Sequence, residues 1–240
     1  MSNRIPVRAG DPRPSRLPVA STMSVAPARL LAVALLGLAV FVFASCGGDS
    51  EPQPTPTPEP VTYRGVLIAP SLEKPDAVLT GTDGQPFDLR KETEGYLTLL
   101  FVGYTSCPDI CPVHMVEISR VLESLPDEVV DRVKVVFVTA DPERDTPEVL
   151  GKWLSYINPE FIGLTGTQEE VDAFQVALRL NPATRTDLGG GNYAVNHAAY
   201  VMAFTTDNLS HIVYPFGVTQ DDWRFDIEQL ALHGWQGEDH

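Results

Sequence analysis

Two cysteines lie at the point where a buried strand is expected to meet a helix. The stretch GYTSCPDICP at 103–112 contains Cys107 and Cys111. It follows the apolar run YLTLLFV at 96–102, which predicts a strand, and it leads into a helical pattern at 113–125. Four residues make about one helical turn, so both sulfurs can face the same side if the helix begins near Cys107. Because free N–H groups at a helix N-terminus favour the thiolate, this junction favours reactive thiols or thiols that bind a soft metal.

The remaining pattern predicts one α/β domain. Apolar runs of strand length alternate with segments of helical periodicity, and a strand pair with a terminal helix closes the chain. The predicted strands cover 96–102, 133–139, 161–164, 199–204 and 211–214, and the predicted helices cover 113–125, 147–156, 167–180 and 221–233. This order favours a sheet covered by helices on both faces. With a cysteine pair at the first of these strand-to-helix junctions, the expected fold is thioredoxin-like, with a central mixed sheet.

Two further segments complete the predicted domain. Short strands at 63–68 and 77–80, a turn at 81–84 and the segment 86–89 predict an added N-terminal β-hairpin at the edge of the sheet. Residues 181–196 are polar, rich in glycine and without periodicity, so a loop is expected there. The sequence shows no internal repeat.

The N-terminus predicts a lipoprotein. The fourteen apolar or glycine residues at 30–43 are too few for a comfortable membrane span and are typical of a signal peptide. Small residues precede Cys46, so residues 1–45 are expected to be the signal peptide and Cys46 the lipidated N-terminus. The protein would then be anchored to the outer face of the cytoplasmic membrane. The alternative is an N-terminal anchor that stays uncleaved, and the compact signal could also begin at Met23.

A proline-rich linker separates this signal from the folded domain. Residues 46–60 have proline at every second position from Pro52 onward and no large apolar side chain to bury. Such a sequence stays extended, at about 3 Å per residue. The folded domain is therefore expected at 61–240, a length that suffices for one hydrophobic core.

The charge of the chain argues against two classes of partner. The whole sequence has a formal net charge of −15. Without residues 1–45 it loses five arginines and one aspartate, which leaves 12 basic and 31 acidic side chains. A domain this acidic is not expected to bind nucleic acid or an anionic lipid surface.

The number of cysteines favours a chemical use of the pair. The chain has three cysteines, and once Cys46 carries lipid, only Cys107 and Cys111 remain. A disulfide between residues so close in sequence removes little chain entropy and would stabilise the fold poorly. Redox chemistry or metal binding is therefore expected, and the Cys-x3-Cys spacing lets both thiolates converge on one ion.

A metal site needs a third ligand, and His197 is the strongest candidate. It directly precedes the predicted strand at 199–204, and in a thioredoxin-like fold the loop before this strand returns beside the cysteine loop. The weaker candidates are His114, His211, His233 and His240. Two thiolates and one imidazole suit copper, as Cu(I) in trigonal geometry or as Cu(II) with an added ligand, whereas structural zinc prefers four ligands.

Four blocks of the sequence resemble the Sco (SenC) family of copper-binding proteins, which act in cytochrome oxidase assembly. These blocks are GYTSCPDICP at 103–112, DPERDTPE at 141–148, GLTGT at 163–167 and VNHAAYVM at 195–202. The resemblance extends from about residue 61 to the C-terminus, and the first two blocks together are highly specific. It implies a thioredoxin-like fold and copper bound by Cys107, Cys111 and His197.

The same resemblance implies partners. It implies a metallochaperone, a binding and transfer protein, that delivers copper to the binuclear CuA centre of cytochrome c oxidase subunit II. A second copper chaperone is a candidate donor of the metal. Members of the family are also proposed to act as thiol reductases that keep the cysteines of the acceptor ready for metal.

Two positions are expected to support the site from outside the ligand set. Asn196 precedes His197 where the family often has Asp, so it can orient the imidazole by a hydrogen bond but adds no negative charge. Asp141 belongs to the second block, and together with Arg144 and Asp145 it is interpreted as a charge cluster that stabilises a loop and not as a group in direct chemistry.

Three other functions stay open. A thiol-disulfide oxidoreductase would attack with Cys107, resolve with Cys111 and need no histidine. A peroxidase of the peroxiredoxin kind shares the fold, but it is expected to have Pro and Thr where this chain has Leu100 and Tyr104. A structural domain with an incidental disulfide would bind no copper after reduction.

Overall fold

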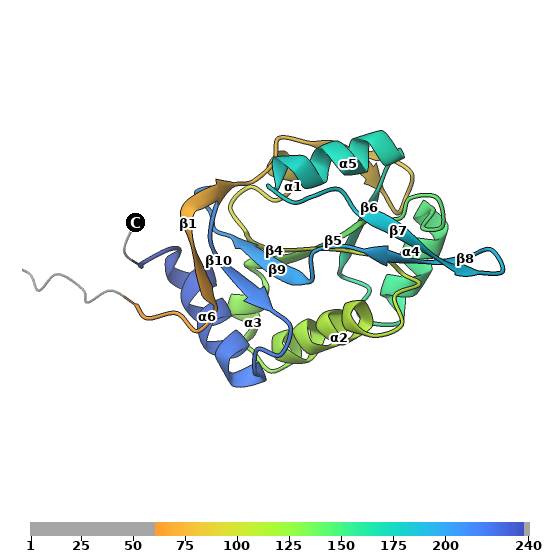
Figure 1. Cartoon of the computed structure of the whole chain (residues 1–240). Helices are drawn as coiled ribbons and strands as arrows, with labels where there is room; N and C mark the ends of the chain where they lie inside the picture. The colour runs from red at the N-terminus through yellow and green to blue at the C-terminus, as the bar shows by residue number, and fades with distance from the viewer. Residues whose placement is uncertain (1–60, 238–240) are drawn as a thin grey trace, which may run out of the picture. The chain divides into compact units, whose positions relative to one another are not determined.

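An eight-stranded mixed sheet runs through residues 61–237, the part of the chain that the structure, a computed structural model, describes (Figure 1). Its strands lie in the order β1-β10-β9-β4-β5-β6-β2-β3. They are β1 (Val66–Glu73), β2 (Val78–Gly81), β3 (Pro86–Asp88), β4 (Leu97–Gly103), β5 (Val133–Thr139), β6 (Ile162–Thr165), β9 (Tyr200–Phe204) and β10 (Leu209–Pro215). The helices are α1 (Leu89–Glu92), α2 (Ile110–Glu123), α3 (Asp127–Val130), α4 (Pro147–Ser155), α5 (Gln168–Ala177) and α6 (Gln220–His233). A separate two-stranded sheet consists of β7 (Thr184–Gly189) and β8 (Asn192–Asn196).

The strand β4 forms the centre of the large sheet. It pairs in parallel with β5 and antiparallel with β9, and all of its residues are buried. This burial arises because helices cover both faces: α2, α3 and α6 lie on one face and α5 on the other (Figure 1). The α/β sheet covered on both faces is therefore as predicted. Two predicted helix starts are also present, since the hydroxyls of Thr146 and Thr167 accept hydrogen bonds from the first turns of α4 and α5.

The prediction that the first strand belongs to the N-terminal hairpin is wrong. This strand lies at the opposite edge of the sheet from the hairpin. The strands β2 and β3 do form a hairpin, and it occupies one edge. The strand β1 instead pairs antiparallel with β10 at the other edge. The buried carboxylate of Asp226 on α6 fixes this placement, because it accepts hydrogen bonds from the backbone N–H groups of Arg64 and Gly65 just before β1. Such pairing depends on contacts distant in sequence, which a local pattern does not contain.

The segment expected to be a loop at 181–196 contains the hairpin β7–β8. Every residue of β7 is exposed, so this strand lacks the alternation that identifies a half-buried strand. In β8, Val195 is the one buried residue. The strand β7 ends at Gly189, and the turn consists of Gly190 and Gly191; all three glycines have positive φ, a conformation that glycine adopts without strain.

The predicted signal peptide, Cys46 and the linker 46–60 lie outside the described residues. Between residues 61 and 237, no helix is long and apolar enough to cross a membrane.

One lysine is fully buried near the start of β4. The side chain of Lys74 is 0% exposed, and its Nζ donates hydrogen bonds to the hydroxyls of Thr93 and Thr98 at 2.9 and 3.1 Å. Burial, aided by the positive charge of Arg90, lowers the pKa of Lys74 to about 8. Between pH 8 and the ordinary lysine pKa, the unfolded chain therefore binds a proton that the folded protein does not.

We expect the free energy of unfolding to rise with pH above 8, because the unfolded chain binds a proton at Lys74 that becomes harder to supply as the pH rises. Relative to Lys74→Met, the free energy of unfolding of the natural protein should rise by about 2 kcal/mol between pH 8 and pH 10.5. Urea unfolding of both proteins across this pH range measures the difference between their free energies of unfolding. The contributions of all other titrating groups cancel in this difference. Parallel pH profiles for the two proteins would contradict the assignment.

Candidate metal centre

The two cysteines lie on the loop and the first helical turn that follow β4. The helix α2 begins at Ile110, after the N-cap Asp109, so Cys111 is within the helix and Cys107 is on the loop before it. The Cys111 side chain is fully buried, whereas Cys107 is half-buried, and both are free thiols. Gly103 allows this close packing, because a Cβ at that position would lie 3.0 Å from the Sγ of Cys111.

The strand β9 brings His197 to the same place. Its antiparallel pairing with β4 places Val201 opposite Phe101, so the start of β9 lies beside the end of β4. His197 precedes β9, and its Nε2 lies 3.4 Å from the Sγ of Cys111. Ligand atoms of Cys107, Cys111 and His197 all lie within 4.8 Å of one another. In residues 61–237 they are the one group of three or more Cys, His, Asp or Glu side chains with metal-binding geometry.

The imidazole of His197 is arranged as a neutral ligand. Its Nδ1 lies 2.8 Å from the carbonyl oxygen of Ala198, which assigns the proton to Nδ1 and leaves the lone pair of Nε2 directed at the cysteines. Burial lowers the pKa of His197, so the ring stays uncharged at neutral pH. The rings of Phe101 and Tyr104 contact it edge-on and hold its plane.

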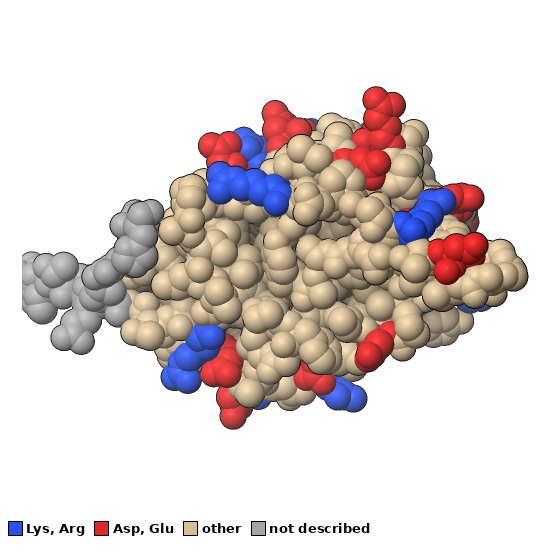
Figure 2. Space-filling view, viewed as in Figure 1, with Lys and Arg blue, Asp and Glu red and all other residues tan. Residues whose placement is uncertain are grey.

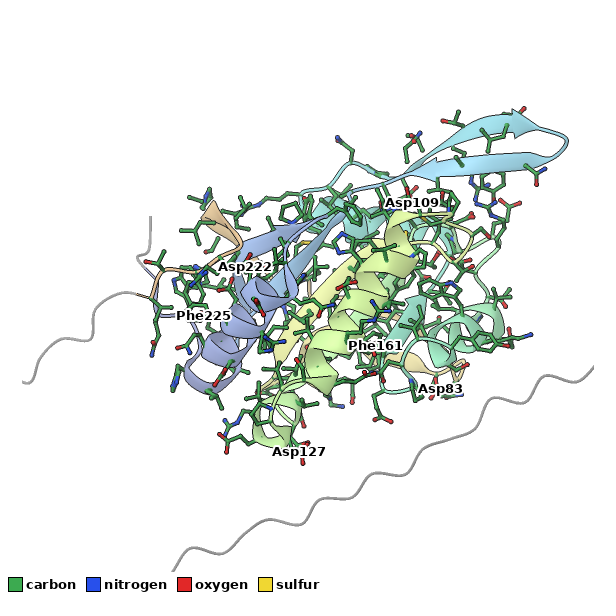
Figure 3. All side chains as sticks on the ribbon, turned by 90° about the horizontal axis from the view of Figure 1, so that it is seen from below. Asp83, Asp109, Asp127, Phe161, Asp222 and Phe225 are labelled. Atoms are coloured by element: carbon green, nitrogen blue, oxygen red, sulfur yellow. The ribbon has the colours of Figure 1, made fainter. Side chains whose placement is uncertain are left out.

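The two thiols differ in acidity. Burial alone would raise the pKa of Cys107, but hydrogen bonds outweigh it and lower the pKa. They come from the backbone N–H groups of Cys111, Asp109 and Ile110 and from the thiol of Cys111. In Figure 3, Asp109 marks the start of α2 that provides these groups. Burial raises the pKa of Cys111 instead. The expected effect of the helix N-terminus is therefore present at Cys107 and reversed at Cys111, because the latter side chain lies in the apolar core.

Comparison with known proteins identifies the family. The model of the SCO1/SenC family matches residues 70–231, well over half of the chain. The chain belongs to the SCO1/SenC family. Members of this family are copper-binding proteins involved in cytochrome c oxidase assembly.

Individual relatives agree with the family match. The SCO2-like protein of Rickettsia prowazekii is 37% identical over 127 residues, 51% of this chain and 59% of that protein. The apo Sco1 protein of Thermus thermophilus shares 30% identity with a TM-score of 0.63, over 70% of this chain and 97% of that structure. The ScoI structure of Bradyrhizobium japonicum, which has copper bound, shares 30% identity with a TM-score of 0.60, over 66% and 98%. The chain spans between 40% and 60% of the length of the curated Sco relatives it matches. The solved Sco structures confirm the expected thioredoxin-like fold.

The other histidines between residues 61 and 237 do not belong to the group of three candidate ligands. His114 is buried one helical turn past Cys111, with its ring packed between Phe101 and Phe216 at centroid distances of 5.1 and 5.5 Å. His211 contacts Asp207 and stacks on Trp235, His233 ends α6, and His240 lies outside the described residues.

The two residues predicted to support the site, Asn196 and Asp141, form hydrogen bonds with other residues and not with the candidate ligands. The Nδ2 of Asn196 donates a hydrogen bond to the Oγ1 of Thr186 at 2.9 Å, so the ring of His197 is oriented by Ala198 and not, as expected from the sequence, by Asn196. Asp141 is fully buried and accepts hydrogen bonds from the side chains of Arg144, Arg185 and Tyr193.

The cysteine loop of this Sco domain is held by a residue from the second sequence block. One carboxylate oxygen of Asp145 accepts hydrogen bonds from the Thr105 N–H at 2.9 Å and the Thr139 hydroxyl at 2.6 Å. The other oxygen accepts a hydrogen bond from the hydroxyl of Thr105 at 2.5 Å. The sequence pattern did not indicate a role for Thr105, Arg185 or Tyr193. Thr105 lies within the first block, and Tyr193 lies two residues before the fourth.

We expect the two thiols to react at different rates. Because Cys107 is accessible and has a lowered pKa, iodoacetamide should alkylate it at least about ten times faster than Cys111 at neutral pH. Mass spectrometry of peptides from a time course measures both rates, and the urea-unfolded protein serves as the control in which the rates converge. Equal rates in the folded protein would contradict the assigned difference in acidity.

Proposed function

We propose that Cys107, Cys111 and His197 bind a single copper ion and that the protein is a membrane-tethered metallochaperone for cytochrome c oxidase. The observation that carries this proposal is the approach of two sulfurs and one imidazole nitrogen within 4.8 Å of one another. An ion with ligand bonds of about 2.0–2.3 Å holds three ligand atoms about 3.5–4 Å apart. Small side-chain movements therefore suffice to close the site around an ion.

The donor set supports copper over other metals. Thiolates are soft ligands that favour Cu(I), and three ligands suit its trigonal coordination, whereas a structural zinc site would need a fourth. The Nε2 of His197 offers its lone pair, and metal binding would displace the proton of Cys111. The copper-bound ScoI of Bradyrhizobium japonicum supports the same assignment by homology. An added ligand would allow Cu(II) as well.

Delivery to the CuA centre of subunit II is supported by the exposure of the site. Cys107 is half-buried and reachable, whereas Cys111 is enclosed, so an acceptor can approach the ion from the side of Cys107. Figure 2 shows charged side chains around the edge of one face, while its middle, over β9 and β10, shows uncharged residues that suit a protein contact. A lipid on Cys46 and the linker 46–60 would hold the domain at the outer face of the cytoplasmic membrane, where a second copper chaperone is a candidate donor.

Thiol-disulfide exchange is the second candidate function. The reachable Cys107, with its lowered pKa, has the properties of an attacking thiolate, and the buried Cys111 has those of a resolving thiol. This chemistry does not use His197. The two functions exclude one another at any moment, because a pair joined as a disulfide offers no thiolates to copper.

A copper titration of the reduced protein tests the main proposal. We expect one Cu(I) per chain and, with Cu(II), an absorption band from thiolate-to-copper charge transfer. The protein oxidised to the Cys107–Cys111 disulfide should bind much less copper in equilibrium dialysis. Equal binding by the oxidised and reduced forms would contradict a site built on these thiolates.

The variant His197→Ala separates the two functions. Removing the imidazole should weaken copper binding at least about ten-fold and change the Cu(II) spectrum, while the rate of thiol-disulfide exchange stays the same. His233→Ala, at the far end of α6, is the matched control that should change neither property. An unchanged copper spectrum and stoichiometry in His197→Ala would remove this residue from the ligand set.

A further inference from the structure

The hairpin that leads into His197 is held to the body of the protein by a cluster of four side chains. The strand β8 ends at Asn196, directly before His197, and its partner β7 is exposed along its whole length. The cluster consists of Asp141 and Arg144 from the loop after β5, Arg185 from β7 and Tyr193 from β8, and we name it the hairpin clasp.

Asp141 is the centre of the hairpin clasp. Its carboxylate is fully buried, and one of its oxygens accepts a hydrogen bond from Arg185 at 3.1 Å and from the hydroxyl of Tyr193 at 2.9 Å. The other oxygen contacts the Nε of Arg144. A buried carboxylate is stable only while it is paired, so the protein favours the arrangement in which both strands of the hairpin reach Asp141.

The ring of Tyr193 adds a second set of contacts. The guanidinium of Arg144 lies 3.8 Å from the centre of this ring, and that of Arg185 lies 4.7 Å from it. Arg144 also donates a hydrogen bond to the backbone carbonyl of Tyr193 at 3.2 Å. These contacts hold β8 at a point four residues before His197.

The same loop also holds the cysteines. Asp145, four residues after Asp141, bonds to Thr105 in the cysteine loop. One short loop therefore fixes the segment with the thiols through Asp145 and the segment with the imidazole through Asp141. The hydrogen bond between the ring of His197 and the carbonyl of Ala198 joins two neighbouring residues, so by itself it does not tie the end of β8 to the cysteine loop.

We propose that the hairpin clasp positions His197 against the two cysteines, so that loosening the clasp withdraws the imidazole and leaves the thiols in place. Asp141, Arg144, Arg185 and Tyr193 are then positioning residues that act on the metal through His197. This proposal rests on the proposed copper site. It adds that the release of the third ligand is controlled by ion pairs outside the site.

The test uses two mild variants of the clasp and one matched control. Arg185→Met removes the ion pairs of Arg185 with Asp141 and with Glu143, and Tyr193→Phe removes one hydrogen bond and leaves the ring. Arg224→Met removes an ion pair with Asp221 on α6, and the exposure of Arg224, 38%, matches the 39% of Arg185. If either clasp variant fails to fold, the other still tests the proposal.

We expect both clasp variants to release copper to a chelator about three to ten times faster than the natural protein. The Cu(II) spectrum should lose part of its nitrogen signature, a change that a merely structural role would not produce. Raising the salt concentration from about 0.02 M to about 0.5 M should speed release from the natural protein more than from Arg185→Met, because salt screens the exposed ion pair between Arg185 and Glu143. Unchanged release rates and spectra in both variants, with Arg224→Met as the reference, would overturn the proposal.

A measurement without copper separates this proposal from the proposed function. In the metal-free protein, both clasp variants should exchange the backbone amides of residues 192–196 faster, while amides of α2 are unaffected. If the natural protein binds no copper, the proposed function fails, and faster exchange in the variants still supports the clasp. If copper binds but amide exchange and the ring signals of His197 are the same in all proteins, the clasp fails and the copper site stands.

Discussion

The antiparallel register between β4 and β9 is the constraint on which the candidate site depends. Phe101 pairs with Val201, so the cysteine loop that continues β4 and the histidine that precedes β9 meet at one end of the sheet. A slip by one residue would move the imidazole by about 3.3 Å and turn alternate side chains to the opposite face. Such a slip is strongly opposed, because Leu99, Leu100, Met202 and Ala203 are buried on both strands. The hydrophobic core therefore determines which residues, distant in sequence, lie close enough to bind the same metal ion.

The site combines one prepared thiol with one protected thiol. The backbone N–H groups at the start of α2 favour the thiolate of Cys107 before any metal arrives, whereas burial keeps the proton on Cys111. The Sγ of Cys111 lies 3.4 Å from the Nε2 of His197, so a metal ion bound by both atoms would displace the thiol proton. Under the proposed function, loading would thus begin at the reachable sulfur and end with the loss of a proton from the enclosed one.

The sequence predicted the local features of this arrangement and missed those that depend on distant contacts. The strand, the cysteine loop and the following helix were predicted from periodicity, but the start of α2 was placed three residues late, after Pro112. Proline is tolerated there because the N–H groups of a first helical turn have no partner within the helix. His197 was found through the expected fold and the family resemblance, since one histidine has no local signature. The strand β7 left no signal because it is exposed and lacks alternation, and the single buried residue of β8, Val195, was too little to indicate a strand. The edge position of β1 left no signal because its partner β10 is far away in sequence.

The acidic side chains near the candidate ligands form hydrogen bonds and ion pairs within the protein. Asp141 is paired with two arginines, and Asp145 is satisfied by the groups of Thr105 and Thr139, so both carboxylates hold loops in place. Asn196, where the family often has an acid, is neutral and turned to Thr186. The negative charge offered to a cation therefore comes from the two sulfurs. Protonation or oxidation of the sulfurs removes this charge while the imidazole stays neutral. Under the proposed function, the affinity for copper would therefore be coupled to the chemical state of the cysteine pair.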